Sequence, residues 1–390
     1  MSYKISDRMA NLKPSAIREM LKATADPDVI SFAAGNPAPD AFPVQSISKI
    51  ASDIFAEDPI GALQYGITEG YTPLRDELKS YLKVKHGIGR DFDDLIITSG
   101  ATQVMELTTK VLCNEGDVII CESPSFIGSL NCFRAFNAKL IGVPIDEDGM
   151  DINALKTVLD HNSKVKFLYT IPNFQNPTGY TMSLEKREAL YKLACEYDFM
   201  IIEDNPYGDL RVAGKELPTI KSFDKEGRVI YAGTFSKLIA PGIRVGYLVA
   251  PAELVSKMVV GKQTEDVHTP MFNQMLVYRW MKENDIDAHI LKMQDIYRKK
   301  LNLMCDLLDE YCPSLSYVRP EGGMFVWCKL PEGMDMLDFC KKCVEHKLAV
   351  VPGTTFLPDE SETTQYIRLN FSTPTDENIE KGIKILGELL

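Results

Sequence analysis

The strongest constraint on the fold is the alternation of short apolar runs with helical patterns between about residues 70 and 250. Several of the apolar runs are continuous rather than alternating, which is typical of strands covered on both faces. The predicted strands are Asp94–Thr98, Asp117–Cys121, Lys139–Val143, Val165–Ile171, Met200–Glu203, Val229–Ala232 and Arg244–Val249. The helical patterns between them are Thr102–Leu112, Ser125–Ala135, Asn153–Leu159 and Ser183–Tyr197. This order predicts an α/β fold with a mostly parallel, seven-stranded sheet and helices on both sides.

The pattern changes after Pro251, and 390 residues exceed what one core usually organises. Two long helical stretches and a third helix are predicted at Asn273–Lys282, Asp287–Tyr311 and Met336–His346. Short strand-like segments lie near Ser316–Val318, Met324–Lys329, Ala349–Val351 and Tyr366–Phe371. We therefore expect a large domain, a smaller C-terminal α/β domain, and an N-terminal segment with one helix, Ser15–Ala25, packed against the small domain. The expected boundaries are 46–270, 271–390 and 1–45.

Charge and composition exclude several classes of protein. The net charge of −12 argues against a nucleic-acid binder, which needs a basic face. The N-terminus has no apolar signal-peptide region, and no apolar run approaches membrane-spanning length. Nine scattered cysteines do not form a disulfide framework, and five histidines show no metal-ligand spacing. We expect a cytoplasmic protein without a metal and without nucleic-acid or membrane partners.

Polar residues gather at the carboxyl ends of four predicted strands, where open α/β sheets place their ligand sites. After the first strand, the small residues Ser99–Thr102 lead into a helix whose free N–H groups suit a phosphate. This signal is weak alone, because many strand-to-helix turns contain Ser-Gly. After another strand, Asn176 precedes a proline and is biased towards an extended backbone. Its amide is then expected to project towards a ligand.

The other two strand ends carry ionisable side chains. Glu203 and Asp204 close an apolar strand, and the period of two sends them to opposite sides of the sheet. Lys237 follows a buried strand, so desolvation should favour its neutral amine, the form that attacks a carbonyl. Arg244, seven residues later, offers the planar fork that suits a phosphate. Together these residues predict a phosphate cradle, a carboxylate and a reactive lysine on neighbouring strand ends.

The sequence resembles the fold-type I, pyridoxal-phosphate-dependent aminotransferases of class I/II over essentially its whole length. The resemblance rests on ordered motifs: Asn-Pro-Thr-Gly from Asn176, Asp-x-x-Tyr from Asp204, Ser-Lys-x-x-x-Pro-Gly-x-Arg-x-Gly from Ser236, and the late Arg368. It implies an aminotransferase that moves an amino group from an α-amino acid to a 2-oxo acid, with 2-oxoglutarate the expected acceptor. The implied chemistry is ping-pong, through an internal aldimine of pyridoxal 5'-phosphate on Lys237.

The resemblance also implies a role for each matching residue. Lys237 forms the imine and then carries the proton, Asp204 partners the pyridine nitrogen, and Arg368 grips the substrate α-carboxylate. Asn176 and Tyr207 hydrogen-bond the ring hydroxyl, and Asn176 also contacts substrate. The phosphate cup comprises Ser99, Gly100, Ala101, Thr102, Ser236 and Arg244. Phe126 stacks on the ring, where the family usually has a tyrosine. Tyr65 reaches the phosphate of a neighbouring subunit, which implies a homodimer with shared active sites.

The N-terminal residues resemble the 2-aminoadipate/kynurenine aminotransferase branch. In that branch the N-terminal helix covers the substrate, and its arginine can pair with an acidic side chain. Arg18 occupies the matching position, although it fits an exposed helix arginine equally well. Gly35 is expected to line the substrate pocket, and Asn36 stands where relatives often have leucine. The expected donors are therefore aromatic, aliphatic or 2-aminoadipate-like amino acids.

Two alternatives stay open at this level. One is another enzyme on the same fold, such as a β-lyase of the cystathionine β-lyase type. The other, more remote, is a transcriptional regulator that carries this domain. Residues 1–30 offer one helix and no basic winged domain, which argues against the regulator.

Overall fold

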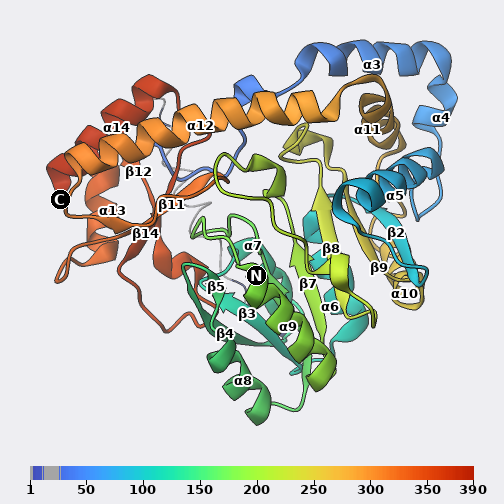
Figure 1. Cartoon of the computed structure of the whole chain (residues 1–390), viewed down its shortest axis with the longest axis horizontal. Helices are drawn as coiled ribbons and strands as arrows, with labels where there is room; N and C mark the ends of the chain where they lie inside the picture. Colours follow the sequence, from blue (N-terminus) through green and yellow to red (C-terminus); the bar gives the residue numbers. More distant parts are fainter. Residues whose placement is uncertain (1–2, 11, 13–25, 27) are drawn as a thin grey trace.

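A computed structural model describes residues 3–10, 12, 26 and 28–390, and its centre is an eight-stranded sheet (Figure 1). The strand order is β2-β9-β8-β7-β6-β3-β4-β5. The strands are β2 (Asp93–Thr98), β3 (Val118–Ser123), β4 (Lys139–Asp146), β5 (Gly149–Met150), β6 (Val165–Thr170), β7 (Met200–Asp204), β8 (Val229–Thr234) and β9 (Gly246–Pro251). The run from β8 through β7, β6 and β3 to β4 is parallel, whereas β9 is antiparallel to both of its neighbours.

The predicted α/β fold is confirmed, and the structure adds one strand to the seven expected. The extra strand, β5, is two residues long and pairs antiparallel with the end of β4 across a tight turn. Such a short strand has too few residues for a period to be read in the sequence. The last predicted strand also begins two residues late, because Arg244 has a φ of 54° and lies in a turn.

Both faces of the sheet are covered by helices, as the continuous apolar runs predicted. Successive strand residues enter different hydrophobic clusters, for example Ile119 in one and Ile120 in the other. The helices of the first cluster include α6 (Ala101–Leu112) and α7 (Ile127–Arg134). Those of the second are α8 (Ile152–His161) and α9 (Leu184–Tyr197). Because helices cover both faces of the sheet, a ligand can reach it only at the ends of the strands.

A second, antiparallel sheet lies towards the C-terminus, with the order β10-β11-β14-β13. Its strands are β10 (Ser316–Tyr317), β11 (Phe325–Lys329), β13 (Val351–Pro352) and β14 (Tyr366–Asn370). The accompanying helices are α13 (Met336–Glu345) and α14 (Asp376–Leu389). Near the N-terminus, after the short helix α1 (Asp7–Ala10), β1 (Ile30–Ser31) pairs in parallel with β12 (Leu348–Ala349). The chain preceding the large sheet thus contacts the C-terminal region.

The remaining helices surround the β2 edge of the large sheet and connect the two regions. They are α3 (Val44–Glu57), α4 (Pro59–Leu63), α5 (Thr72–His86), α10 (Ala252–Gln263) and α11 (Met271–Glu283). The long helix α12 (Ile286–Tyr311) runs from the α11 end to the small sheet, where it packs against α14 (Figure 1). Because α11 packs against α3, α4 and α5, its contacts make it part of the region built around the large sheet. The predicted helix Ser15–Ala25 lies outside the described residues.

Candidate active site

A cavity of about 320 Å³ lies at the carboxyl ends of β2, β6, β7 and β8. It collects residues that are far apart in the sequence, from the N-terminal segment to β14. The predicted site residues among its lining are Gly35, Ala101, Thr102, Phe126, Asn176, Asp204, Tyr207, Ser236, Lys237, Arg244 and Arg368. The four strand exits singled out in the sequence therefore meet at one place.

Lys237 lies in this cavity with an amine whose basicity is reduced. Its Nζ donates a hydrogen bond of 2.7 Å to the carbonyl oxygen of Gly35. Burial, together with the positive charges of Arg368 and Arg244, lowers the pKa of Lys237 to about 8. About a tenth of the lysine is therefore a neutral amine at pH 7, far more than for an unperturbed lysine, and this is the form that attacks a carbonyl carbon. The expectation that desolvation acts on this lysine is confirmed.

Asp204 ends β7 with one carboxylate oxygen satisfied and the other free. Its Oδ2 accepts a hydrogen bond of 2.8 Å from the Tyr169 hydroxyl. Its Oδ1 is buried and has no partner among the described residues. Burial raises the pKa of Asp204 to about 7, although the Tyr169 hydrogen bond acts in the opposite direction. A buried carboxylate oxygen without a donor is costly unless a ligand supplies one.

The neighbouring carboxylate, Glu203, faces away from the cavity. It accepts hydrogen bonds from the backbone N–H groups of Ile220 and Lys221, at 2.8 and 2.7 Å. The prediction that only one carboxylate of the pair faces the site is confirmed.

Arg368, on β14, presents its guanidinium to the cavity from the small sheet. Nη1 donates to Asn176 Oδ1 at 2.9 Å, and Nη2 donates to the carbonyl oxygen of Ala33 at 2.8 Å. Its Nε is buried without a partner in the described part of the chain. The guanidinium carbon lies 4.2 Å from the centre of the Phe325 ring. These contacts fix the plane of the guanidinium and leave N–H groups for a carboxylate.

Asn176 and Tyr207 form one polar unit beside this arginine. Asn176 donates from Nδ2 to the Tyr207 hydroxyl at 3.3 Å, and its Oδ1 is the acceptor for Arg368. Both side chains are buried. The Tyr207 hydroxyl accepts this bond and keeps its own proton for a ligand oxygen.

The turn before α6 forms a concave surface suited to an anion. Gly100 has a φ of +84°, and a Cβ atom there would lie 2.0 Å from Nη2 of Arg244. Arg244 in turn donates to the Ser99 carbonyl oxygen at 3.1 Å and to the Ser236 hydroxyl at 3.4 Å. The first N–H groups of α6 have no acceptor within the helix. An arginine and a helix N-terminus therefore converge on one spot, as a phosphate requires.

These residues fit pyridoxal phosphate. The anion-binding turn matches its phosphate, the unpartnered Oδ1 of Asp204 matches a protonated ring nitrogen, and the Lys237 amine matches its aldehyde carbon. The free Nε of Arg368 is left for the carboxylate of an amino acid. Each match rests on a polar group that the described chain itself leaves unsatisfied or exposed to the cavity.

Glu122, at the end of β3, supports the loop that carries Asn176 and was not predicted from the sequence. It accepts hydrogen bonds from Thr170 Oγ1, from the Ile171 N–H at 3.2 Å and from Gln175 Nε2 at 3.1 Å. Burial raises the pKa of Glu122 to about 7, against the effect of these donors. Because Gln175 precedes Asn176 directly, Glu122 helps to fix the position of the Asn176 amide.

Tyr169 is the second contributor that sequence reasoning missed. It is the second-to-last residue of β6 and follows the apolar residues Phe167 and Leu168. A buried tyrosine needs a partner for its hydroxyl, so the residue was a usable signal, but the identity of the partner depends on the pairing of β6 with β7.

Three predicted site residues in the described part of the chain do not line this cavity: Ser99 and Gly100, which directly precede its lining residue Ala101, and Tyr65. Tyr65 is 81% exposed and lies beside His268, with ring centroids 5.8 Å apart, outside the cavity of its own chain. Arg18 lies outside the described residues. Neither prediction is tested by the geometry.

Two further features of the described residues bear on the excluded classes. They contain no cluster of three or more His, Cys, Asp or Glu side chains able to hold a metal ion. Within the same ranges, no helix combines the length and apolarity needed to cross a bilayer.

Comparison with known proteins identifies close relatives. The family model of class I and II aminotransferases matches residues 27–386. The chain is 40% identical to aromatic-amino-acid aminotransferase 1 of Thermococcus litoralis, covering 99% of this chain and 93% of that protein. Among solved structures, it resembles the multiple substrate aminotransferase from Thermococcus profundus, with a TM-score of 0.94, 39% identity, and 99% and 96% of the two chains covered. It also resembles the α-aminoadipate aminotransferase from Thermus thermophilus, crystallised with N-(5'-phosphopyridoxyl)-L-leucine, at a TM-score of 0.90, 35% identity, and 99% and 97% coverage.

Proposed function

The chain belongs to the class I and II aminotransferases and is a pyridoxal-phosphate-dependent enzyme; from this premise we propose that Lys237, Asp204 and Arg368 are its central functional residues. The observation that carries the proposal is their convergence in one cavity, with Asp204 Oδ1 and Arg368 Nε both lacking partners among the described residues. Tyr207, Asn176, Phe126 and the turn at Ser99–Thr102, with Ser236 and Arg244, complete the proposed cofactor site.

In this proposal each residue does one task. Arg368 binds the substrate α-carboxylate in a two-pronged grip and so orients the Cα–H bond towards Lys237. The neutral amine of Lys237 takes the proton from Cα and returns it to the cofactor carbon. Asp204 keeps a proton on the ring nitrogen by accepting it in a hydrogen bond. Bound pyridoxal phosphate supplies the electron sink for the charge left on Cα.

We propose that the donors are aromatic, aliphatic or 2-aminoadipate-like amino acids and that 2-oxoglutarate is an acceptor. The names of the relatives support this range, since they include an aromatic-amino-acid, a multiple substrate and an α-aminoadipate enzyme. Apolar side chains of Ile171 and Phe325 line the cavity beside Arg368 and suit an apolar side chain. Arg18 and Gly35 are proposed to contact the substrate.

A donor panel with 2-oxoglutarate tests the reaction and ranks the donors. Production of glutamate supports transamination, whereas pyruvate and ammonia from a cysteine conjugate would identify a β-lyase. Borohydride should trap the cofactor on Lys237, and Lys237→Ala should still bind the cofactor through its phosphate but lose the proton transfer. Labelling on another residue would refute the proposed role of Lys237.

Arg368→Lys gives a sharper test of the carboxylate grip. Lysine keeps the charge but loses the planar fork, so kcat/KM for every donor should fall by about tenfold or more. The matched control is Arg319→Lys, because Arg319 is an exposed arginine of the same region that pairs with Asp306. An unchanged kcat/KM in Arg368→Lys would remove the grip from the proposal.

We further propose a cytoplasmic homodimer in which Tyr65 reaches the phosphate in the neighbouring subunit. The support is a group of exposed apolar side chains on α4 and the loop that follows it: Ile60, Leu63, Tyr65 and Ile67. Adjacent exposed apolar residues of this kind mark association surfaces. Light scattering on the purified protein measures the assembly, and a monomer that retains full activity would refute the shared site.

The expected division into residues 1–45, 46–270 and 271–390 stays a prediction. The packing of α11 against α3, α4 and α5 supports moving the second boundary into α12.

A further inference from the structure

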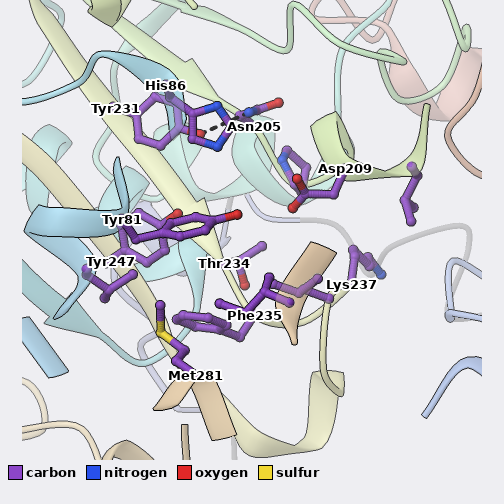
Figure 2. A pocket seen from close by; sticks show the side chains of 15 residues that line it. Tyr81, His86, Asn205, Asp209, Tyr231, Thr234, Phe235, Lys237, Tyr247 and Met281 are labelled. Carbon is purple, nitrogen blue, oxygen red and sulfur yellow. Dashed lines mark hydrogen bonds between the residues drawn. The ribbon is translucent and has the colours of Figure 1, made fainter. Parts of the chain in front are cut away.

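A second, smaller cavity of about 30 Å³ adjoins the site cavity at Lys237 (Figure 2). The two cavities share Pro206, Thr234 and Lys237 as lining residues. The rest of the smaller cavity lies between α5 and strands β8 and β9, away from the residues proposed to bind substrate. Its volume gives room for about two water molecules, provided that polar groups face it.

Polar groups do face the smaller cavity, and one of them has no partner. The Tyr81 hydroxyl is buried without a hydrogen bond to the described residues. The carboxylate residue Asp209, in the short helix η2 (Gly208–Leu210), also lines the space. Figure 2 shows both side chains around the space, with Thr234 between them and Lys237 along one side. An unpaired buried hydroxyl beside a carboxylate at one small cavity indicates that water fills it.

A directed chain of hydrogen bonds adds a donor to this cavity. Arg187 Nη2 donates to Asn173 Oδ1 at 2.7 Å, and Asn173 Nδ2 donates to Asn205 Oδ1 at 2.9 Å. Asn205 Nδ2 then donates to the Tyr231 hydroxyl, also at 2.9 Å. Every bond runs in the same direction, so the Tyr231 hydroxyl accepts and its own proton is left to donate. Since Tyr231 lines the cavity, that proton is available to water there.

Asp209 connects the smaller cavity with the protein surface. It also lines an open groove of about 280 Å³, together with Lys85, Arg211, Glu216 and Gln294. Lys85 and Glu216 are solvent-exposed. Lys237 therefore lies between the site cavity and the smaller cavity. Asp209 lies between the smaller cavity and the groove.

The charged surroundings of Asp209 suit a group that changes its protonation state. The ionisable groups that act on it are His86 and Lys85 of α5, Glu216 of the groove and Asp287 of α12. Burial raises the pKa of Asp209 and lowers the pKa of His86. Both shifts favour the neutral forms of the two residues, so the Asp209 carboxyl can hold a proton beside the cavity.

We propose that Asp209 and the smaller cavity form a water-filled proton passage between solvent and the Lys237 amine. The passage exchanges protons one for one: the Lys237 ammonium gives a proton to cavity water, and water returns one to the amine. No net charge moves and no other reactant is needed. The inference rests on the proposed role of Lys237 as proton carrier, and it explains how that amine stays in contact with solvent when substrate fills the front of the site.

An isotope experiment on the intact holoenzyme tests the passage. The donor carries deuterium at Cα, the solvent is ordinary water, and mass spectrometry measures the fraction of deuterium retained on the aminated cofactor after one half-reaction. The Lys237 ammonium holds two solvent-derived protons beside the deuteron, so its rotation alone limits retention to about one third. A working passage exchanges these hydrogens with solvent and lowers the wild-type retention well below that limit. Asp209→Asn and Tyr81→Phe should each raise the retained fraction by about twofold or more, and Asp209→Glu should restore the wild-type value.

The matched control is Asp295→Asn, because Asp295 is a 67% exposed carboxylate of α12 that lines neither the smaller cavity nor the groove and is not among the groups that act on Asp209. It should leave retention unchanged. Wild-type retention at or above about one third, or equal retention in wild type, Asp209→Asn and Tyr81→Phe, would overturn the passage. Failure of the proposed role of Lys237 gives a different result: Lys237→Ala would then still transfer deuterium to the cofactor.

Discussion

Replacing Asp204 by asparagine should stabilise the cofactor-free protein at alkaline pH and greatly reduce the stabilisation that the cofactor brings. The carboxylate is 5% exposed, and its Oδ1 has no partner among the described residues. Burial raises the pKa of Asp204 from 3.8 to about 7. A folded-state pKa above the unfolded value means that the folded chain binds more protons between these limits, so its stability falls as the pH rises through that window.

The size of the effect follows from the shift. One pKa unit corresponds to about 1.4 kcal/mol, so the whole shift costs roughly 4 kcal/mol once the carboxyl is ionised. Between pH 5 and pH 8, about two of these units accrue, which is about 3 kcal/mol. With an unfolding entropy of roughly 2 cal/mol/K for each of 390 residues, this corresponds to about 3–4 °C in Tm.

Thermal unfolding of both proteins without cofactor, at pH 5 and pH 8, measures this difference. Asp204→Asn should gain about 3–4 °C over the wild-type protein between the two pH values. Adding pyridoxal phosphate at pH 8 should stabilise the wild type strongly, because the ring nitrogen then supplies the missing donor, and should stabilise the variant much less. A Tm difference that does not change with pH would show that Asp204 carries no buried charge and would refute the reasoning.

Two further substitutions test the surroundings of the cofactor. Tyr169→Phe removes the hydrogen bond to Asp204, and a hydrogen bond to a charged group is worth about 1.5–3 kcal/mol. The value of kcat/KM should therefore fall by about tenfold or more. Steady-state kinetics from pH 6 to 9 should show the larger loss at low pH, where the carboxyl of Asp204 takes up its proton more readily. Gly100→Ala places a Cβ atom 2.0 Å from Arg244 Nη2 and should weaken cofactor binding by about tenfold or more in an absorbance titration. Gly116→Ala is the matched control, because Gly116 has a similar φ of +79° with no atom near its Cβ position, and it should leave the affinity unchanged.

The parts of the fold that follow from local pattern were predictable from the sequence. Continuous apolar runs identified the seven longer strands of the large sheet, and the alternation of side chains placed Glu203 and Asp204 on opposite faces. Ligand sites in open α/β sheets lie at the carboxyl ends of the strands, which predicted that Lys237 and Asp204 share one site. Both residues line the same cavity. Each of these inferences needs only the period of a strand and the geometry of a parallel sheet.

Contacts between distant parts of the chain were beyond the sequence. Glu122 acts through Gln175, 53 residues later, and the pairing of Tyr169 with Asp204 depends on the register of β6 against β7. The position of α11 on the large region, against the expected boundary at residue 270, likewise depends on helix packing. Such partners are decided by three-dimensional packing among many residues, and a local period carries no information about them.

The unpartnered polar atoms that line the cavities of this chain are positions where a ligand or water is expected to complete a hydrogen bond. Buried polar groups are nearly always paired in folded proteins, because an unpaired group costs about 1–3 kcal/mol. Here Asp204 Oδ1 and Arg368 Nε, both buried and unpartnered among the described residues, belong to residues that line one cavity. This free-energy cost is recovered only when a ligand brings a hydrogen-bond donor to Asp204 Oδ1 and an acceptor to Arg368 Nε. The two atoms therefore weaken the cofactor-free fold, and they also select a ligand with a protonated ring nitrogen and one with a carboxylate. The Tyr81 hydroxyl, unpaired beside the smaller cavity, follows the same logic with water as the partner.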